Sequence, residues 1–244
     1  MERFRATTNK YALMRRFGGS GASPNAKYSD TFTTATQQLT VPGTYFNFGT
    51  NPFTVELWVY PTAIANGSYY DLIDSDNGSV YFTFGIVGQP GGGVLRFVFN
   101  NGAGGTASAS QSTGNLSTAT WYHIALMRNG DSTSLFVNGI CRATVSGMAA
   151  LSINTGLIWR IGGNSAGANQ FIGSLTNVRI VSDYNVYSFG TTVGTQYFIP
   201  PSAPLENIGR TQLLIQGLSD VSPNALTVTN VGVVTTGSTP SPFA

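Results

Sequence analysis

The sequence predicts an all-β protein of the sandwich or barrel type. The chain has 30 glycines and 11 prolines, about 17% of its 244 residues, against roughly 12% in an average protein, so it makes many turns. Hydrophobic residues make up 41%, which excludes a disordered chain. About a dozen short segments of strand character recur at intervals of 8–14 residues, a spacing typical of antiparallel sandwiches and barrels.

The individual strands are predicted from alternating hydrophobicity between turn sequences. In 53–60, FTVELWVY, the odd-numbered residues are apolar and the even-numbered ones mix polar and aromatic groups, as expected for a strand with one core face. DSDNG (74–78), GQPGGG (88–93), Asn129-Gly130 and Asn138-Gly139 are turn signals. We expect a loop over 102–115. The expected strands are 38–41, 53–60, 69–73, 80–87, 94–100, 121–129, 134–137, 141–145, 157–161, 171–180, 211–216, 225–228 and 231–235.

Residues 1–27 differ from the rest of the chain. They contain six Lys or Arg and only Glu2 as an acid, whereas residues 28–244 contain six Arg and nine acids. We therefore predict a basic N-terminal arm (1–27) and one domain (28–244), since no linker divides the latter. Within the arm, NKYALMRRF (9–17) favours one short helical turn, and GGSGAS (18–23) a flexible joint.

The arm has the composition of an anchor for another protein. Apolar and aromatic side chains interleave with its arginines, which suits a protein groove better than nucleic acid. Beyond residue 27, six arginines in 217 residues are too few for a surface that follows phosphates, so nucleic-acid binding is not expected. The expected anchoring residues are Arg3, Phe4, Arg5, Tyr11, Met14, Arg15, Arg16 and Phe17.

Cellular location is predicted from missing signals. The lone Cys141 allows no intramolecular disulfide and is expected to act as a small apolar residue. Early charges and the lack of an apolar run argue against a secretory signal, and no stretch of about 18 apolar residues predicts a membrane span. The sequence therefore predicts synthesis in a cytoplasm and no membrane partner.

Few residues could carry catalysis or bind a metal. A glycosidase needs two facing carboxylates, and on a strand these would be acids two positions apart, on the same face. No acid lies near enough to Glu56 in the sequence to form such a pair. We therefore expect Glu56 to be exposed or hydrogen-bonded on the polar face of its sheet, and we expect no enzyme. A lone His123 cannot form a zinc site and is expected to be structural. Asp74 and Asp76 make a weak candidate calcium loop, because only part of the required spacing is present; a plain hairpin turn is favoured, and no cofactor is expected.

Several segments resemble a known family in order. FGTNPFTVELWVYPT (48–62), WYHIALMRNGDSTSLFVNG (121–139), IGG (161–163) and FIGSLTNVRI (171–180) resemble the laminin G-like branch of the concanavalin A-like lectin/glucanase superfamily. RIVSDYNVY (179–187), FIPPSAPL (198–205) and LLIQG (213–217) resemble versions found in bacteriophage virion proteins, notably those of cyanophages. The resemblance implies a jelly-roll sandwich of two curved antiparallel sheets whose concave face or loop rim binds sugars in some members.

The resemblance also gives the expected function. We expect a non-enzymatic phage virion protein, displayed on the particle, anchored by residues 1–27 to other capsid or tail proteins, and assembled as a homo-oligomer or lattice. It would decorate the capsid or form a compact part of the tail. The alternative is a glycan-binding adhesin for host adsorption, and a glycoside hydrolase is a remote third reading. Possible glycan contacts are Trp58, Tyr60, Tyr69 and Tyr70, with the asparagines near 100–101 and 164–169.

Overall fold

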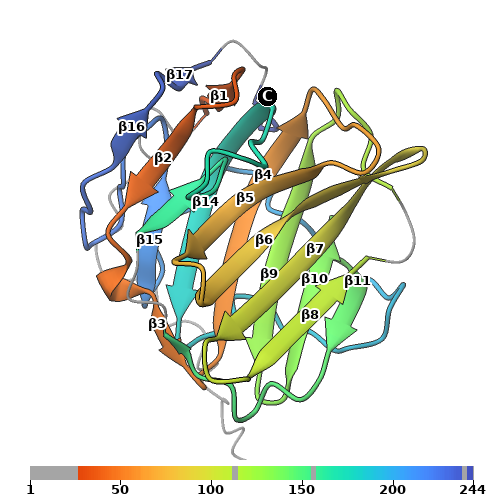
Figure 1. Cartoon of the computed structure of the whole chain (residues 1–244). Helices are drawn as coiled ribbons and strands as arrows, with labels where there is room; N and C mark the ends of the chain where they lie inside the picture. Colours follow the sequence, from red (N-terminus) through yellow and green to blue (C-terminus); the bar gives the residue numbers. More distant parts are fainter. Residues whose placement is uncertain (1–26, 112–114, 155–157, 238–240, 244) are drawn as a thin grey trace, which may run out of the picture.

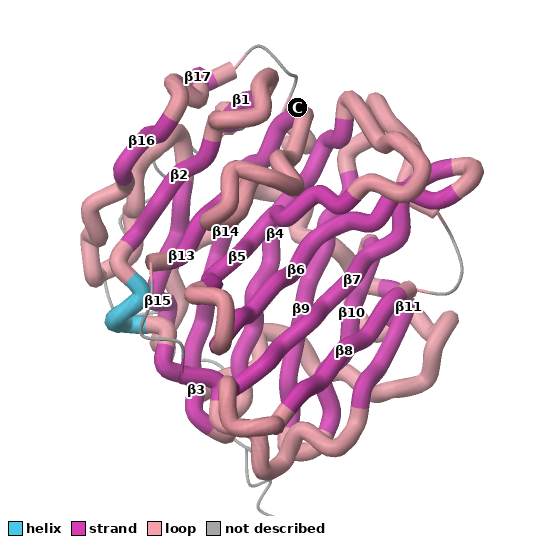
Figure 2. Tube along the Cα trace, in the orientation of Figure 1, coloured by secondary structure: helices cyan, strands magenta, loops and turns pink. Residues whose placement is uncertain are grey.

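The structure of the chain, a computed structural model, describes residues 27–111, 115–154, 158–237 and 241–243. Within these residues the chain forms an eight-stranded and a seven-stranded antiparallel sheet packed face to face (Figures 1 and 2). One 3-10 turn, Gly43–Tyr45, is the single helical element of the described part. The predicted all-β sandwich is confirmed.

The eight-stranded sheet has the order β11-β10-β9-β4-β14-β1-β17, and β15 pairs with β14 on the same side as β1. Its hairpins end in the predicted turns: Asn138 and Gly139 both have positive φ angles, 49° and 78°, as a two-residue hairpin loop requires. The strands are β1 (Asp30–Phe32), β4 (Phe53–Pro61), β9 (Tyr122–Asn129), β10 (Ser132–Val137), β11 (Ile140–Val145), β14 (Gly173–Ser182), β15 (Thr211–Ile215) and β17 (Thr235–Thr236).

The seven-stranded sheet lies in front in Figure 1 and has the order β16-β2-β13-β5-β6-β7-β8. Its strands are β16 (Thr229–Val231), β2 (Gln38–Val41), β13 (Trp159–Ile161), β5 (Tyr69–Asp76), β6 (Val80–Gln89), β7 (Gly92–Asn101) and β8 (Thr106–Ser110). The register between β5 and β6 shifts between Asp71 and Ile73. This bulge keeps Asp71, Asp74 and Asp76 on the outer face of β5 while Ile73 faces the core. A small two-stranded sheet joins β3 (Asn47–Gly49) to β12 (Ile153–Asn154).

The core between the sheets follows the predicted alternation. The odd-numbered residues of β4 from Phe53 to Val59 are fully buried. Aromatic rings fill the space opposite them: Phe48 stacks on Phe53 with centroids 4.6 Å apart, and Phe82 lies 4.8 Å from Trp159. Such close aromatic contacts add to the burial of apolar area, so this cluster fixes the two sheets against each other.

A segment without regular structure covers the outer face of the eight-stranded sheet. We call residues 183–210 the covering segment. Its backbone pairs with the β11 edge, where Cys141 N–H donates to Thr195 O (2.9 Å) and Tyr197 N–H to Gly139 O (2.9 Å). Its side chains Tyr187, Phe189, Tyr197 and Phe198 pack on Ala125, Met127, Phe136 and Cys141. This part of the sheet is therefore buried on both faces, and the prediction that Cys141 acts as a small apolar residue is confirmed.

Three local predictions were wrong. Residues 106–110 form β8 instead of a loop; their small side chains alternate between buried alanines and exposed serines but carry little β propensity. Residues 225–228 are not a strand, because the Asp220 carboxylate accepts the Leu226 N–H at 2.7 Å and holds the chain in a turn. Within 231–235, only Val231, the end of β16, and Thr235, the first residue of β17, are strand.

The predicted anchoring arm lies outside the described residues except for Lys27. This applies to the helical turn at 9–17, the joint at 18–23 and the anchoring residues Arg3, Phe4, Arg5, Tyr11, Met14, Arg15, Arg16 and Phe17. The division of the chain into 1–27 and 28–244 stays a prediction.

Candidate functional site

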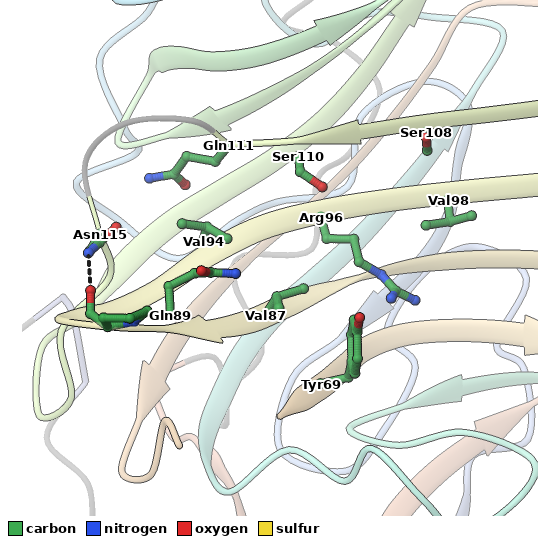
Figure 3. A pocket seen from close by; sticks show the side chains of 11 residues that line it. Tyr69, Val87, Gln89, Val94, Arg96, Val98, Ser108, Ser110, Gln111 and Asn115 are labelled. Atoms are coloured by element: carbon green, nitrogen blue, oxygen red, sulfur yellow. Dashed lines mark hydrogen bonds between the residues drawn. The ribbon is translucent and has the colours of Figure 1, made fainter. Parts of the chain in front are cut away.

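A groove of about 810 Å³ crosses the outer face of the seven-stranded sheet over β5, β6, β7 and β8 (Figure 3). We call it the Tyr69 groove. The outward-facing side chains of four adjacent strands form its floor, because residues two apart on a strand share a face. Its lining residues are Tyr69, Val87, Gln89, Pro90, Val94, Arg96, Val98, Ser108, Ser110, Gln111 and Asn115.

Tyr69 and Arg96 form a stacked pair in this groove. Tyr69 is 44% exposed, and the Arg96 guanidinium carbon lies 4.6 Å from the centre of its ring, a cation–π contact. The strand β6 runs between the strands that carry Tyr69 and Arg96. Its Gly85 lies directly opposite Arg96 on one side and Asp71 on the other. A β-carbon at Gly85 would lie 2.4 Å from the Tyr70 carbonyl oxygen, so the backbone requires glycine here and leaves the arginine room to cross the strand.

The rest of the lining is neutral. Gln89, Ser108, Ser110 and Asn115 are exposed and offer amide and hydroxyl groups that can both donate and accept hydrogen bonds. Val87, Val94 and Val98 supply apolar floor between them. Among the described residues that line the groove, Arg96 carries the one charge and no side chain is an acid.

A second hollow, of about 420 Å³, adjoins the groove, and Tyr69 lines both. We call it the side pocket. Its far wall is the loop 167–170, which is held along β5 because Asp71 N–H donates to Asn169 O at 2.8 Å. The Asp71 carboxylate accepts the side-chain amides of Asn164 (3.2 Å) and Asn169 (3.0 Å). These two asparagines therefore brace the loop instead of pointing free amides at a ligand.

A buried polar cluster lies on the opposite sheet, between β4, β9, β14 and the covering segment. Glu56 accepts hydrogen bonds from Arg179 Nε (2.8 Å), Arg179 Nη2 (2.6 Å) and the Tyr187 hydroxyl (2.8 Å), and its Oε2 lies 3.0 Å from His123 Nε2. Burial raises the pKa of Glu56, but the hydrogen bond to His123 and the charge of Arg179 outweigh it and lower the pKa to about 2. Glu56 and His123 are fully buried, so the cluster joins the covering segment to the sheet.

Comparison with known proteins gives the family. Residues 33–184 match the family model described as concanavalin A-like lectin/glucanases superfamily. The chain belongs to this superfamily. Its laminin G-like character, inferred from the sequence, agrees with this match. A comparison with curated proteins returned no significant match.

Solved structures share the fold of this superfamily at low identity. A putative carbohydrate binding protein from Bacteroides ovatus is 16% identical, with 89% of this chain and 62% of that chain covered and a TM-score of 0.51. Laminin α1 domains LG4-5 from mouse are 18% identical over 63% of this chain and 40% of that one, with a TM-score of 0.49. The heptameric SAP-like pentraxin of Limulus polyphemus is 14% identical over 65% and 77%, with a TM-score of 0.47.

The four aromatic residues proposed as glycan contacts do not share one surface in this superfamily member. Tyr69 lines the groove, but Tyr70 is only 8% exposed and its hydroxyl accepts the Ala65 N–H at 2.8 Å. Trp58 and Tyr60 lie on β4 in the other sheet. Of the four, Tyr69 alone combines exposure with a place in the groove. Its partner Arg96 was not among the predicted contacts. Arg96 lies in the expected strand 94–100, and the alternation of side chains along that strand could have placed it on the outer face.

Asp74 and Asp76 belong to the β5–β6 hairpin, and the plain hairpin turn favoured from the sequence is present. Asp76 Oδ1 accepts the Gly78 N–H (2.5 Å) and Asn77 Oδ1 the Val80 N–H (2.8 Å), which closes the turn between β5 and β6. Asp74 Oδ1 accepts the Thr83 hydroxyl (3.1 Å). Within the described part of the chain, no three His, Cys, Asp or Glu side chains gather as a metal site, and no helix there is long and apolar enough to cross a membrane.

Proposed function

We propose that this chain is a non-enzymatic carbohydrate-binding domain and that the Tyr69 groove is its binding surface. The observation that carries the proposal is the chemistry of the groove: an exposed aromatic ring stands among neutral amides and hydroxyls over an apolar floor. Sugars present alternating C–H faces and hydroxyl groups, which such a surface complements. The volume falls within the range of ligand sites, about 300–1,000 Å³.

Membership of a superfamily of lectins and glucanases supports this proposal. The fold alone does not decide function, because one fold carries many. Binding without hydrolysis is therefore inferred from the residues of the groove. No acid is among the described lining residues of either hollow, whereas glycosidases need two carboxylates across the sugar. Glu56 is buried on the other sheet with its carboxylate fully engaged.

The test is loss of binding in Tyr69→Ala. We expect the wild-type chain to bind a subset of glycans on an array, and Tyr69→Ala to weaken that binding about tenfold, because the ring contact is lost. Tyr184→Ala is the matched control: Tyr184 is 49% exposed but lies on the covering segment, so binding should be unchanged. Equal binding by both variants, or a wild-type chain that binds no glycan, would overturn the proposal.

A second proposal concerns where the domain acts. We propose that it is displayed on a bacteriophage particle, as a capsid decoration or a compact tail component, after synthesis in the host cytoplasm. Support comes from the resemblance of 179–187, 198–205 and 213–217 to phage virion proteins and from the charge of residues 1–27. The arm would bind other virion proteins, and copies of the chain would form an oligomer or lattice that presents the grooves to host glycans.

Deletion of residues 1–20 tests the anchor. We expect particles assembled with the shortened chain to lack the protein, while the purified shortened chain keeps the melting temperature of the full chain. Full incorporation of the shortened chain into particles would contradict the anchoring role and leave the carbohydrate-binding proposal untouched.

A further inference from the structure

We propose that the Tyr69 groove selects acidic sugars, and that Arg96 binds their carboxylate or sulfate group. This inference rests on the proposed carbohydrate-binding function and adds the ligand class. It starts from the charge of the groove: Arg96 is the one charged side chain among its described lining residues. A neutral lining with a single guanidinium gives the groove a local positive potential that a neutral sugar would leave unused.

The hydrogen-bonding capacity of Arg96 is free. Within the described part of the chain, its guanidinium makes no hydrogen bond and no ion pair; it stacks on Tyr69 at 4.6 Å and interacts with Asp71 only through its charge. By contrast, Arg179 on the opposite sheet bonds to Glu56 and to the Glu206 carbonyl oxygen. A guanidinium carries five N–H donors in a planar fork that matches a carboxylate or sulfate. Stacking on the ring holds that plane and leaves the fork edge for a ligand.

A second donor, Ser110, lies on the other side of Arg96 from Tyr69. Ser110 lies directly opposite Arg96 in the β7–β8 register and is exposed, and directly opposite side chains start about 4.5–5.5 Å apart. Figure 3 shows Arg96 between Ser110 and Tyr69, with its head group toward the ring. An anionic group over the Tyr69 side of the groove can therefore accept hydrogen bonds from the guanidinium while the sugar ring rests against Tyr69, and Ser110 offers a further hydroxyl on the other side of Arg96.

Arg96 interacts through its charge with Asp71, but Asp71 does not form an ion pair that would neutralise the arginine. Burial raises the pKa of Asp71, while the amide of Asn169 and the charge of Arg96 lower it. Its Oδ2 already accepts the amides of Asn164 and Asn169. No ion pair joins Asp71 to Arg96, since β6 with Gly85 lies between their strands. The positive charge therefore remains available to a ligand in the groove.

The experiment compares matched acidic and neutral sugars. The probes are sialyllactose and lactose, trigalacturonate and its methyl ester, and sulfated lactose with lactose, on an array and then by calorimetry with the full chain. We expect an acidic member to bind at least about tenfold more tightly than its neutral partner. Arg96→Gln should lower the affinity for the acidic member about tenfold to a hundredfold, as for a lost charge-assisted contact, and so bring it down to that of the neutral member. Arg96→Lys should recover only part of the loss, because it keeps the charge without the fork.

Arg210→Gln is the control, because Arg210 is exposed and pairs with Asp183 beyond β14, on the other sheet. It should retain the preference for acidic sugars. Equal binding of acidic and neutral members by the wild-type chain would overturn the inference while the carbohydrate-binding function stands. A preference for acids that survives in Arg96→Gln would overturn the role of Arg96. Absence of all glycan binding would overturn the proposed function and this inference together.

Discussion

Glu56 is the centre of the buried polar cluster between the eight-stranded sheet and the covering segment. Its carboxylate joins Arg179, His123 and Tyr187 inside the protein, and its removal leaves the buried Arg179 guanidinium without its carboxylate partner. Removing one member of a buried pair costs about 3–5 kcal/mol. We expect Glu56→Ala to lower the free energy of unfolding by that amount in chemical denaturation.

Glu206→Ala is the control, because the Glu206 side chain is exposed and such changes cost within about 0.5 kcal/mol. The pKa of Glu56 falls from 4.5 to about 2 on folding, so its stabilisation is complete above pH 4.5 and is lost as the pH falls toward 2. The deficit of Glu56→Ala should therefore shrink in acid. A deficit that is the same at pH 7 and near pH 2 would contradict this role.

Asp74 and Asp30 have the opposite effect on stability. Burial raises the pKa of each to about 7, and for Asp74 the nearby charge of Asp71 adds to the rise. The folded chain then holds protons that the unfolded chain has already lost, so these groups reduce stability as the pH rises from about 4 to about 7. We expect Asp74→Asn to flatten this decline, and Asp30→Asn with Asp74→Asn to flatten it further, in unfolding experiments across that range. Curves parallel to wild type would show that Asp74 is ionised in the folded protein.

At the scale of elements, the turn between β10 and β11 fits against the covering segment. Gly139 has φ +78°, and a β-carbon there would lie 1.8 Å from the Phe198 carbonyl oxygen. Gly130, in the turn between β9 and β10, has φ +58° and nothing within 4 Å of such a carbon. Both glycines have a positive φ, but a β-carbon would meet close atoms only at Gly139.

This difference makes a matched pair of variants. Gly130→Ala carries only the backbone strain, about 1 kcal/mol, whereas Gly139→Ala adds a clash of the kind that costs about 1–3 kcal/mol. We expect Gly139→Ala to be the less stable by that difference in thermal denaturation. It should also speed proteolysis within 183–210, which Gly130→Ala should not. Equal stability of the two variants would mean that the covering segment does not press on the turn.

At the scale of the whole molecule, local sequence patterns predicted the sheets better than the surfaces. Alternation in 53–60 and the Asn-Gly turns identified β4 and the β9–β10–β11 hairpins, because both signals reside within a few residues. The partners of Glu56 could not be predicted in this way: Arg179 and Tyr187 lie more than 120 positions away. The place of Arg96 beside Tyr69 likewise depends on strand order, which no short pattern encodes.

The covering segment also determines which fragment of the chain could be moved to another protein as a stable domain. The family match ends at residue 184, yet β15 and the segment that hides Met127, Phe136 and Cys141 follow it. A fusion protein that carries only residues 27–184 would expose the apolar outer face of the eight-stranded sheet to solvent. We expect that fragment to aggregate on expression. A piece carrying 27–244 keeps this face covered and should remain in the supernatant, so the stretch that could be moved to another protein is the longer one.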